Sequence, residues 1–575
     1  WQWNNYGFYG LRGTENTVGF NGGTAGTAAY LDKMFSGSTY SSSDSITCVN
    51  GYENLTSFYS SADVTNNRGR LDTSNAISMN DAFNGCSKLT TLDVSAFDTS
   101  QVKEFAKMFA GCTKLTSLDV SGFDTTAATN FFGMFFNCTL VTSLDVSRFN
   151  TQKVTNMSYM FDGCARLSSI PTTSFATTQV KTMQHMFANC SALTAPAVAG
   201  FDTRNVTNMN GMFQGCSQAT LLPVTAFSTA NVTNMSDMFS GCSSITVLDV
   251  SGFKTSLVQS FSSMFSSCSK LSTIPVSSFD TAAATTMQGM FNGCSGLTTL
   301  DVSKFKTGSV TSMMNMFNGC SKLTLLDVSQ FITSNVTDFD SMFEGCSGLS
   351  VIDVSKFVTT KATDMREMFK GCSGVTSLNL LNFNTAKVVY MQYMFYGVNK
   401  PATLDLSSFN TAKVTTMQHM FSYCSNLTTA PVSTKWTTDH IGKEYTTSNG
   451  TISYIGSLSD TAFTGCSKIV GQNGTRYSTS RNSVTYARID YGTPEPGYFT
   501  VKGGIAVKFH QNVDSYYPLK SGVTPPSVLV LPNGNGSNVG THAYTSPWTM
   551  DSKSLRQDHG FRGWYTARTG GTHIP

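Results

Sequence analysis

The chain has 575 residues, of which 13% are charged, and its formal net charge is +3. Charged residues usually make up roughly 25% of a globular protein. So small a net charge gives no electrostatic reason to expect binding to nucleic acid or to an anionic membrane surface. No apolar run reaches the roughly 18 residues that a membrane-spanning helix needs.

The first 70 residues are predicted to form an N-terminal cap. They are rich in aromatic residues, with Trp1, Trp3 and Tyr6 at the start. A degenerate copy of the motif that dominates the rest of the chain follows at residues 33–37. Atypical terminal repeats are what a stack of repeats needs at its ends.

Residues 71–430 carry a regular repeat of 26 residues, which we call a rung. Its clearest marker is a cysteine that recurs with this step and is replaced once, by Val398: Cys86, Cys112, Cys138, Cys164, Cys190, Cys216, Cys242, Cys268, Cys294, Cys320, Cys346, Cys372 and Cys424. A fixed period of 20 to 50 residues indicates stacked units, each too small to bury its own apolar face. The sequence therefore predicts a solenoid.

A single rung, residues 86–111, shows the expected elements. Leu92 and Val94 alternate with a polar residue, which predicts a short strand, and a phenylalanine closes it at Phe97. A threonine two residues later could cap a helix start, and Val102, Phe105, Met108, Phe109 and Cys112 then recur at helical spacing. We expect an α/β solenoid resembling leucine-rich repeats, with about 14 strand-turn-short-helix rungs and a parallel sheet.

Two side-chain ladders follow from this stacking. Parallel cysteines about 4.8 Å apart on neighbouring rungs do not point toward one another, which favours unpaired thiols in the core over disulfides. The methionine and phenylalanine stripe is interpreted as core rather than as a soft ligand-binding surface, because its spacing turns every member inward.

An outward column of aspartates is the candidate binding face. It consists of Asp93, Asp119, Asp145, Asp249, Asp301, Asp327, Asp353 and Asp405, and Pro171, Ala197, Pro223 and Pro275 interrupt it. One interpretation is a solvated ladder without a ligand; the other is a surface that binds protein or glycan. Calcium is disfavoured because it needs six to eight oxygen ligands, which serine and threonine hydroxyls supply poorly.

The repeat degrades toward the C-terminus. Residues 431–500 are predicted to hold degenerate rungs and a cap, with the last echo of the repeat at Cys466. Residues 501–575 alternate in hydrophobicity at Ile505, Val507 and Phe509 and then become rich in proline and glycine. This pattern predicts a separate small β-rich module.

The rung pattern C-S-x-L-T-x-L-D-V-S-x-F-x-T-x-x-V-T-x-M-x-x-M-F-x-G resembles BspA-like leucine-rich-repeat surface proteins. Phe561–Thr566 with Gly570–Thr572 is similar to the Listeria–Bacteroides repeat of internalin-type proteins. The resemblance implies an extracellular bacterial cell-surface protein, with any signal peptide and anchor outside this sequence. It also implies adhesion to protein or glycan on a host or neighbouring cell, and no shared catalytic residues.

The sequence itself shows no recognised catalytic, metal-binding or phosphate-binding motif, so we expect no enzyme activity, no cofactor and no metal. His185 and His419 share a position in the rung but are nine rungs apart, which rules out a shared metal. The alternative to an adhesin is a structural subunit of a filament, sheath or layer, in which copies of the chain bind one another. Such head-to-tail contacts between copies would give open polymers.

Overall fold

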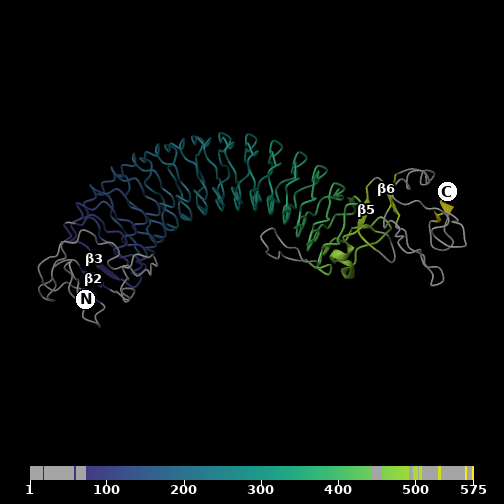
Figure 1. The fold of residues 1–575 in the computed structure, drawn as a ribbon, viewed down its shortest axis with the longest axis horizontal. Helices are drawn as coiled ribbons and strands as arrows, with labels where there is room; N and C mark the ends of the chain where they lie inside the picture. Colours follow the sequence, from purple (N-terminus) through teal and green to yellow (C-terminus); the bar gives the residue numbers. More distant parts are fainter. Residues whose placement is uncertain are drawn as a thin grey trace, which may run out of the picture. The chain divides into compact units, whose positions relative to one another are not determined.

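The computed structural model describes residues 73–442 apart from Asn75, residues 456–490 and 496–502, and the backbone of a few short strands elsewhere. The chain divides into two compact units. Unit 1 comprises Trp1–Phe357 and Glu367–Val375, and unit 2 comprises Val358–Arg366 and Thr376–Pro575. Within each unit the regular rungs stack one on the next as successive coils (Figure 1).

The assigned elements are short. In unit 1, β1 (Thr17–Val18), β2 (Ser57–Tyr59) and β3 (Thr91–Asp93) form a parallel sheet in that order. In unit 2, β4 (Ala430–Val432) pairs in parallel with β5 (Phe499–Val501), and two 3₁₀ helices lie between them in the chain, η3 (Thr479–Arg481) and η4 (Val484–Tyr486). Two antiparallel pairs follow, β6 (Gly504–Val507) with β7 (Leu529–Pro532) and β8 (Trp564–Tyr565) with β9 (His573–Ile574).

The short helix expected in each rung is not formed, and this prediction is wrong for the described residues. The stripe from Phe105 to Cys112 folds into successive tight turns, in which the amide of Met108 donates to the carbonyl of Phe105 at 3.2 Å. The intervening amides donate to the next rung instead, as when Lys107 donates to Phe132 at 2.7 Å. Alternate amides of this stripe therefore donate to carbonyls of the same rung and of the next rung. No amide is left to make the hydrogen bonds between residues i and i−4 that an α-helix requires.

Left-handed backbone makes these turns possible. Two positions per rung have positive φ, and in one rung they are Lys107 (φ 54°) and Gly111 (φ 72°). Glycine adopts this region without steric cost, whereas an α-helix requires negative φ throughout. The glycine that precedes most of the ladder cysteines is thus part of a turn and not the end of a helix.

The continuous parallel ladder also lies on this side of the rung. In unit 1 it runs through isolated bridges from Ser78–Glu104 to Ser312–Asp338, and in unit 2 from Asp364 through Tyr390 to Thr416. On the opposite side, β3 is followed by no further strand in the described rungs of unit 1. Prolines at several of those positions lack the amide that a ladder needs. The parallel arrangement is as predicted, but its regular part lies elsewhere in the rung.

Stacked phenylalanine rings form the centre of unit 1. Consecutive rings have centroids 5.6–6.0 Å apart along this series: Phe83, Phe109, Phe135, Phe161, Phe187, Phe213, Phe239, Phe265, Phe291, Phe317, Phe343 and Phe369. The methionines of the stripe are buried beside them. The interpretation of this stripe as core is confirmed, since its described members are closed to solvent.

The cysteine ladder is also internal. Every described ladder cysteine is buried and unpaired. The thiol of Cys190, for example, donates to the carbonyl of Phe161 in the preceding rung, with a sulfur–oxygen distance of 3.1 Å. The predicted ladder of free, buried thiols is confirmed for these residues, and Cys48 lies outside the described part of the chain.

Unit 2 ends its rungs with a polar closure. The carboxylate of Asp490, fully buried, accepts hydrogen bonds from the amides of Asn473 (2.9 Å) and Gly497 (3.3 Å) and from the hydroxyl of Thr475 (2.8 Å). These donors hold the segment that leads into β5. The proposed division at residues 70, 430 and 500, and the β-rich module at 501–575, stay predictions because most of that module lies outside the described residues.

Candidate interaction surface

The predicted aspartate column lies on the side of the rung that contains β3 and its equivalents, which we call the strand-side face. Six of the eight carboxylates are exposed, and Asp93 and Asp405 are half-buried. Each accepts the amide hydrogen of the serine two residues later at 2.9–3.1 Å, as Asp249 does from Ser251. The first role of this column is therefore structural, because each side chain closes a local turn.

These hydrogen bonds keep the column charged. The serine hydroxyl and amide both favour the ionised form and lower the pKa of Asp249 and Asp327 below the ordinary value. The neighbouring carboxylate of Asp327 opposes this shift at Asp301, whose pKa is still lowered. The exposed column is thus anionic at any pH above the ordinary range of aspartate.

The carboxylates do not converge on a shared centre. Among the described residues, no group of three or more histidine, cysteine, aspartate or glutamate side chains could hold a metal ion. In unit 2, Asp405 pairs with Lys502 at 2.6 Å, which neutralises it locally. The column is therefore a repeated surface feature.

A second feature of this face is a stripe of exposed aliphatic side chains, which sequence reasoning missed. Leu221, Val247, Leu325 and Val351 occupy equivalent positions in their rungs and are 57%, 73%, 76% and 56% exposed. A single exposed apolar residue is ordinary, but a series on one face marks an interaction surface. The signal was present in the sequence, since these positions carry serine or threonine in most other rungs.

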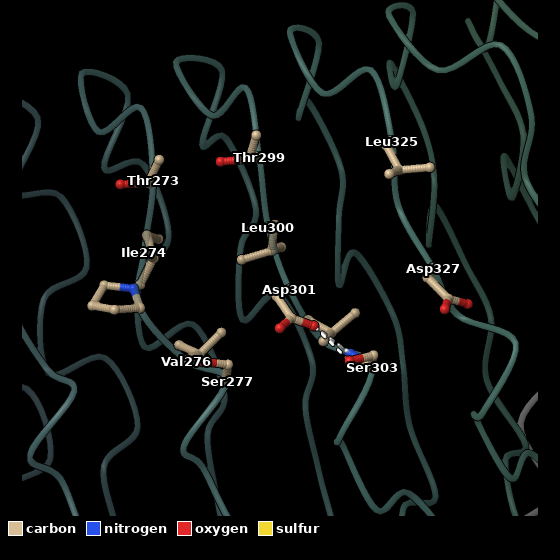
Figure 2. A pocket seen from close by; sticks show the side chains of 12 residues that line it. Thr273, Ile274, Val276, Ser277, Thr299, Leu300, Asp301, Ser303, Leu325 and Asp327 are labelled. Carbon is tan, nitrogen blue, oxygen red and sulfur yellow. Dashed lines mark hydrogen bonds between the residues drawn. The ribbon is translucent and has the colours of Figure 1, made fainter.

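A shallow hollow of about 510 Å³ interrupts the stripe (Figure 2). Thr273 and Thr299 take the place of the longer side chains on either side, and Pro275 replaces an aspartate of the column. Leu325 and the carboxylates of Asp301 and Asp327 border it. The hollow combines an aliphatic wall with two anionic groups, all within unit 1.

The aspartate column is discontinuous in the way the sequence indicates. Between Asp145 and Asp249 the equivalent positions hold Pro171, Ala197 and Pro223, which removes three consecutive carboxylates. The strand-side face of unit 1 therefore has anionic flanks and an uncharged middle. A functional difference between these parts stays a prediction.

The opposite side of the rung, formed by the left-handed turns from Glu104 to Cys112 and their equivalents, is called the turn-side face. It carries two stacked tyrosine–histidine pairs, Tyr159 with His185 and Tyr393 with His419. Sequence reasoning recognised the shared register of the two histidines but not these pairs. The detectable signal was the hexapeptide Thr-Met-Gln-His-Met-Phe, present at both 182–187 and 416–421.

Five overlapping matches to one protein family extend from residue 53 to residue 454. The family is described as a Mycoplasma protein of unknown function, DUF285, and the matches cover residues 53–170, 142–220, 195–299, 272–377 and 344–454. This chain belongs to the DUF285 family. The match ends before residues 501–575, so the internalin-type resemblance of that segment, like the BspA-like resemblance of the rungs, stays a prediction.

Solved structures of other repeat proteins show limited likeness. A leucine rich cell surface protein of Faecalibacterium prausnitzii A2-165 is 16% identical over 64% of this chain and 88% of its own length, with a TM-score of 0.31. A leucine-rich repeat protein of Eubacterium ventriosum ATCC 27560 is 19% identical over 50% and 82%, with a TM-score of 0.27. An internalin of Listeria monocytogenes is 13% identical over 61% and 82%, with a TM-score of 0.15. At these TM-scores the likenesses say nothing about function.

No curated protein matches the chain. In the part of the chain that the structure describes, no helix has the length and apolarity to cross a membrane.

Proposed function

We propose that this DUF285 chain is a non-enzymatic extracellular surface protein of the BspA-like kind. It binds protein or glycan on a host or neighbouring cell through the strand-side face, with the C-terminal module as a second contact. The observation that carries the proposal is the exposed aliphatic stripe beside the charged aspartate column. Apolar side chains that stay more than half exposed in a folded chain gain most from a partner that covers them.

The sparse charge of the chain and its unreactive buried thiols support an extracellular setting. Charge is sparse, and burial raises the pKa of ladder thiols such as Cys86 and Cys138 to about 12. A thiol must be ionised and accessible to be oxidised or to exchange disulfides. These cysteines therefore withstand an oxidising environment without pairing, so a cysteine-rich chain of this kind is compatible with life outside the cell.

Repetition supports a binding rather than a catalytic role. Equivalent aspartates and aliphatic residues recur along the strand-side face of unit 1, which offers many similar weak contacts instead of one convergent site. Weak contacts presented on one body add through avidity. An adhesive surface uses this property directly, whereas catalysis needs a single preorganised group of residues.

The test is a binding assay on immobilised extracellular matrix proteins and on whole bacterial cells. Val351→Thr with Leu325→Thr should weaken binding by about 10-fold, since each side chain loses its apolar contact with the partner. Ile332→Thr is the matched control, because Ile332 is also 56% exposed but lies outside the stripe. Equal loss in the control, or no loss in the double variant, would contradict the assignment of the strand-side face.

The competing function, a structural subunit, is tested on the same purified chain. Light scattering and electron microscopy should show single particles with the mass of one chain. Ordered fibres or sheets that form without any partner would replace adhesion with self-assembly as the function.

A further inference from the structure

The turn-side face carries strained aromatic residues in two places. At the first left-handed position of the rung, most rungs use glycine, serine, asparagine or a charged residue. Tyr159 and His185 adopt φ values of 59° and 52° there. Bulky residues avoid this region because the side chain crowds the backbone there. Strain kept at a surface position points to a use for the side chain.

The two rings form a compact platform. The ring centroids of Tyr159 and His185 lie 4.9 Å apart, with an angle of 6° between the planes, and both side chains are half-buried. The rungs on either side have Gly133 and Gly211 at the same position. A Cβ atom at Gly211 would come within 2.5 Å of the His185 ring. Glycine thus leaves the platform without a neighbouring side chain at this position.

Two phenylalanines and several planar polar groups border the rings. Phe132 and Phe136 pack edge-on against Tyr159, with centroids 5.5 and 6.2 Å from its own. The amide of Gln184 donates to the Tyr159 hydroxyl at 2.9 Å, and the His185 Nε2 atom shares a hydrogen bond of 2.9 Å with the Asn210 Oδ1 atom. The carboxylate of Asp162 accepts from Asn189 at 2.9 Å one turn away. These hydrogen bonds hold the two rings and the amides beside them in fixed orientations.

A similar stacked pair occurs in unit 2, where hydroxyls replace the amides: His419 Nδ1 lies 3.0 Å from the Ser422 hydroxyl and 3.1 Å from the Thr461 hydroxyl. Tyr393 and His419 stack with centroids 5.0 Å apart, also at left-handed φ. Tyr396 packs edge-on against His419 at 6.3 Å, and Tyr423, 50% exposed, lies 5.2 Å from Tyr396. Two stacked tyrosine–histidine pairs within a chain of otherwise variable surface residues argue against chance.

The composition of the Tyr159–His185 cluster restricts the ligand. A sugar ring has an apolar C–H face and a rim of hydroxyls, which suits flat aromatic rings bordered by amides and carboxylates. The stripe of exposed aliphatic residues that would favour a protein partner lies on the strand-side face instead. The carboxylates of Asp162 and Asp237 both interact with His185, and negative charge there disfavours a phosphate, sulfate or sialic acid.

We propose that the Tyr159–His185 and Tyr393–His419 pairs are two equivalent binding sites for neutral saccharides. The proposal goes beyond the proposed function, because it adds a second surface with its own ligand to the strand-side face.

Calorimetry with neutral linear hexasaccharides of glucose, mannose and galactose tests the proposal on the full chain. Replacing the four rings with glycine, the native residue at Gly133 and Gly211, preserves the left-handed backbone. We expect this variant to bind the preferred hexasaccharide at least about 10-fold more weakly. Ser263→Gly with Asn315→Gly, at the same position in rungs that flank neither pair, should leave binding unchanged, and Val351→Thr with Leu325→Thr should do so too.

Three outcomes would overturn the assignment. They are no binding of any neutral hexasaccharide by the native chain, equal loss in the Ser263 and Asn315 control, and ring-dependent binding of a protein surface whose glycans periodate has destroyed. The last would make the platforms a protein interface. Because strand-side variants are tested in parallel, failure here is distinguishable from failure of the proposed adhesive function.

Discussion

The hydroxyl of Thr281 exchanges two hydrogen bonds with the backbone of Lys306 in the next rung. It donates to the Lys306 carbonyl at 3.0 Å and accepts the Lys306 amide hydrogen at 2.7 Å. Thr229 makes the same pair of bonds with Lys254. A buried side chain therefore completes the main-chain pairing between rungs at a corner where the two backbones do not bond directly.

Removing this hydroxyl should loosen the stack locally. Thr281→Val keeps the shape but leaves the amide and the carbonyl of Lys306 without their partner, which costs about 1–3 kcal/mol. Thr281→Ser keeps the hydroxyl and should retain most of the stability. Urea unfolding fitted with a nearest-neighbour repeat treatment measures both. A valine variant as stable as the serine variant would show that the Thr281–Lys306 bonds contribute little.

The left-handed turns predict opposite effects for two substitutions in adjacent rungs. Ser267 and Gly293 occupy the same position, with φ values of 60° and 71°. Ser267→Gly should raise the free energy of unfolding by up to about 1 kcal/mol, because it removes a steric clash of the serine Cβ. Gly293→Ala should lower it, since the new Cβ would lie 3.3–3.4 Å from atoms of Ser267. Thermal unfolding of the two variants should move in opposite directions, and a common direction would contradict this account.

The buried thiols should be chemically silent in the folded chain. Burial raises the pKa of Cys242 and Cys294 to about 12, so almost no thiolate exists at pH 8. In a Cys48→Ser background, a thiol reagent should label the native chain negligibly and the urea-unfolded chain fully. Rapid labelling at pH 8 without denaturant would show that the ladder opens to solvent.

The sequence was sufficient for the solenoid, its period and its core, because apolar residues that must face inward repeat at fixed spacing. It was insufficient for the backbone of the turn side. Val102, Phe105, Met108 and Phe109 point inward both in a helix and in a series of tight turns, so the spacing alone cannot distinguish them. The left-handed φ at Lys107 and its equivalents excludes a helix. The sequence does not reveal this φ, because these positions hold many residue types.

Of the two candidate surfaces, the sequence likewise predicts one and not the other. The aspartate column was predictable because Asp249 and its equivalents alternate with buried residues on a short extended segment. The aromatic platforms were not, because the stacking of Tyr159 on His185 depends on left-handed turns that place side chains of successive rungs face to face. A helix would have given these side chains different neighbours.

Asp162 and Asp119 should change the free energy of unfolding in opposite directions as the pH rises. Burial raises the pKa of Asp162, although a hydrogen bond from Asn189 and the nearby His185 oppose this. The folded state then binds a proton more tightly than the unfolded state, so this contribution is present at low pH and is lost as the pH rises through the raised pKa. Asp162→Asn should remove that loss and stabilise the chain at neutral pH.

Asp119 is the control with the reverse sign. Hydrogen bonds from the hydroxyl and amide of Ser121 lower its pKa, so its contribution is present above the ordinary aspartate value and is lost as the pH falls toward the lowered one. Asp119→Asn should therefore weaken the fold at neutral pH and flatten the acid side of the curve. Unfolding midpoints of the native chain and both variants from pH 3 to pH 8 would reveal the two signs. If both variants shift the curve in the same direction, the local environments assigned to Asp162 and Asp119 are wrong.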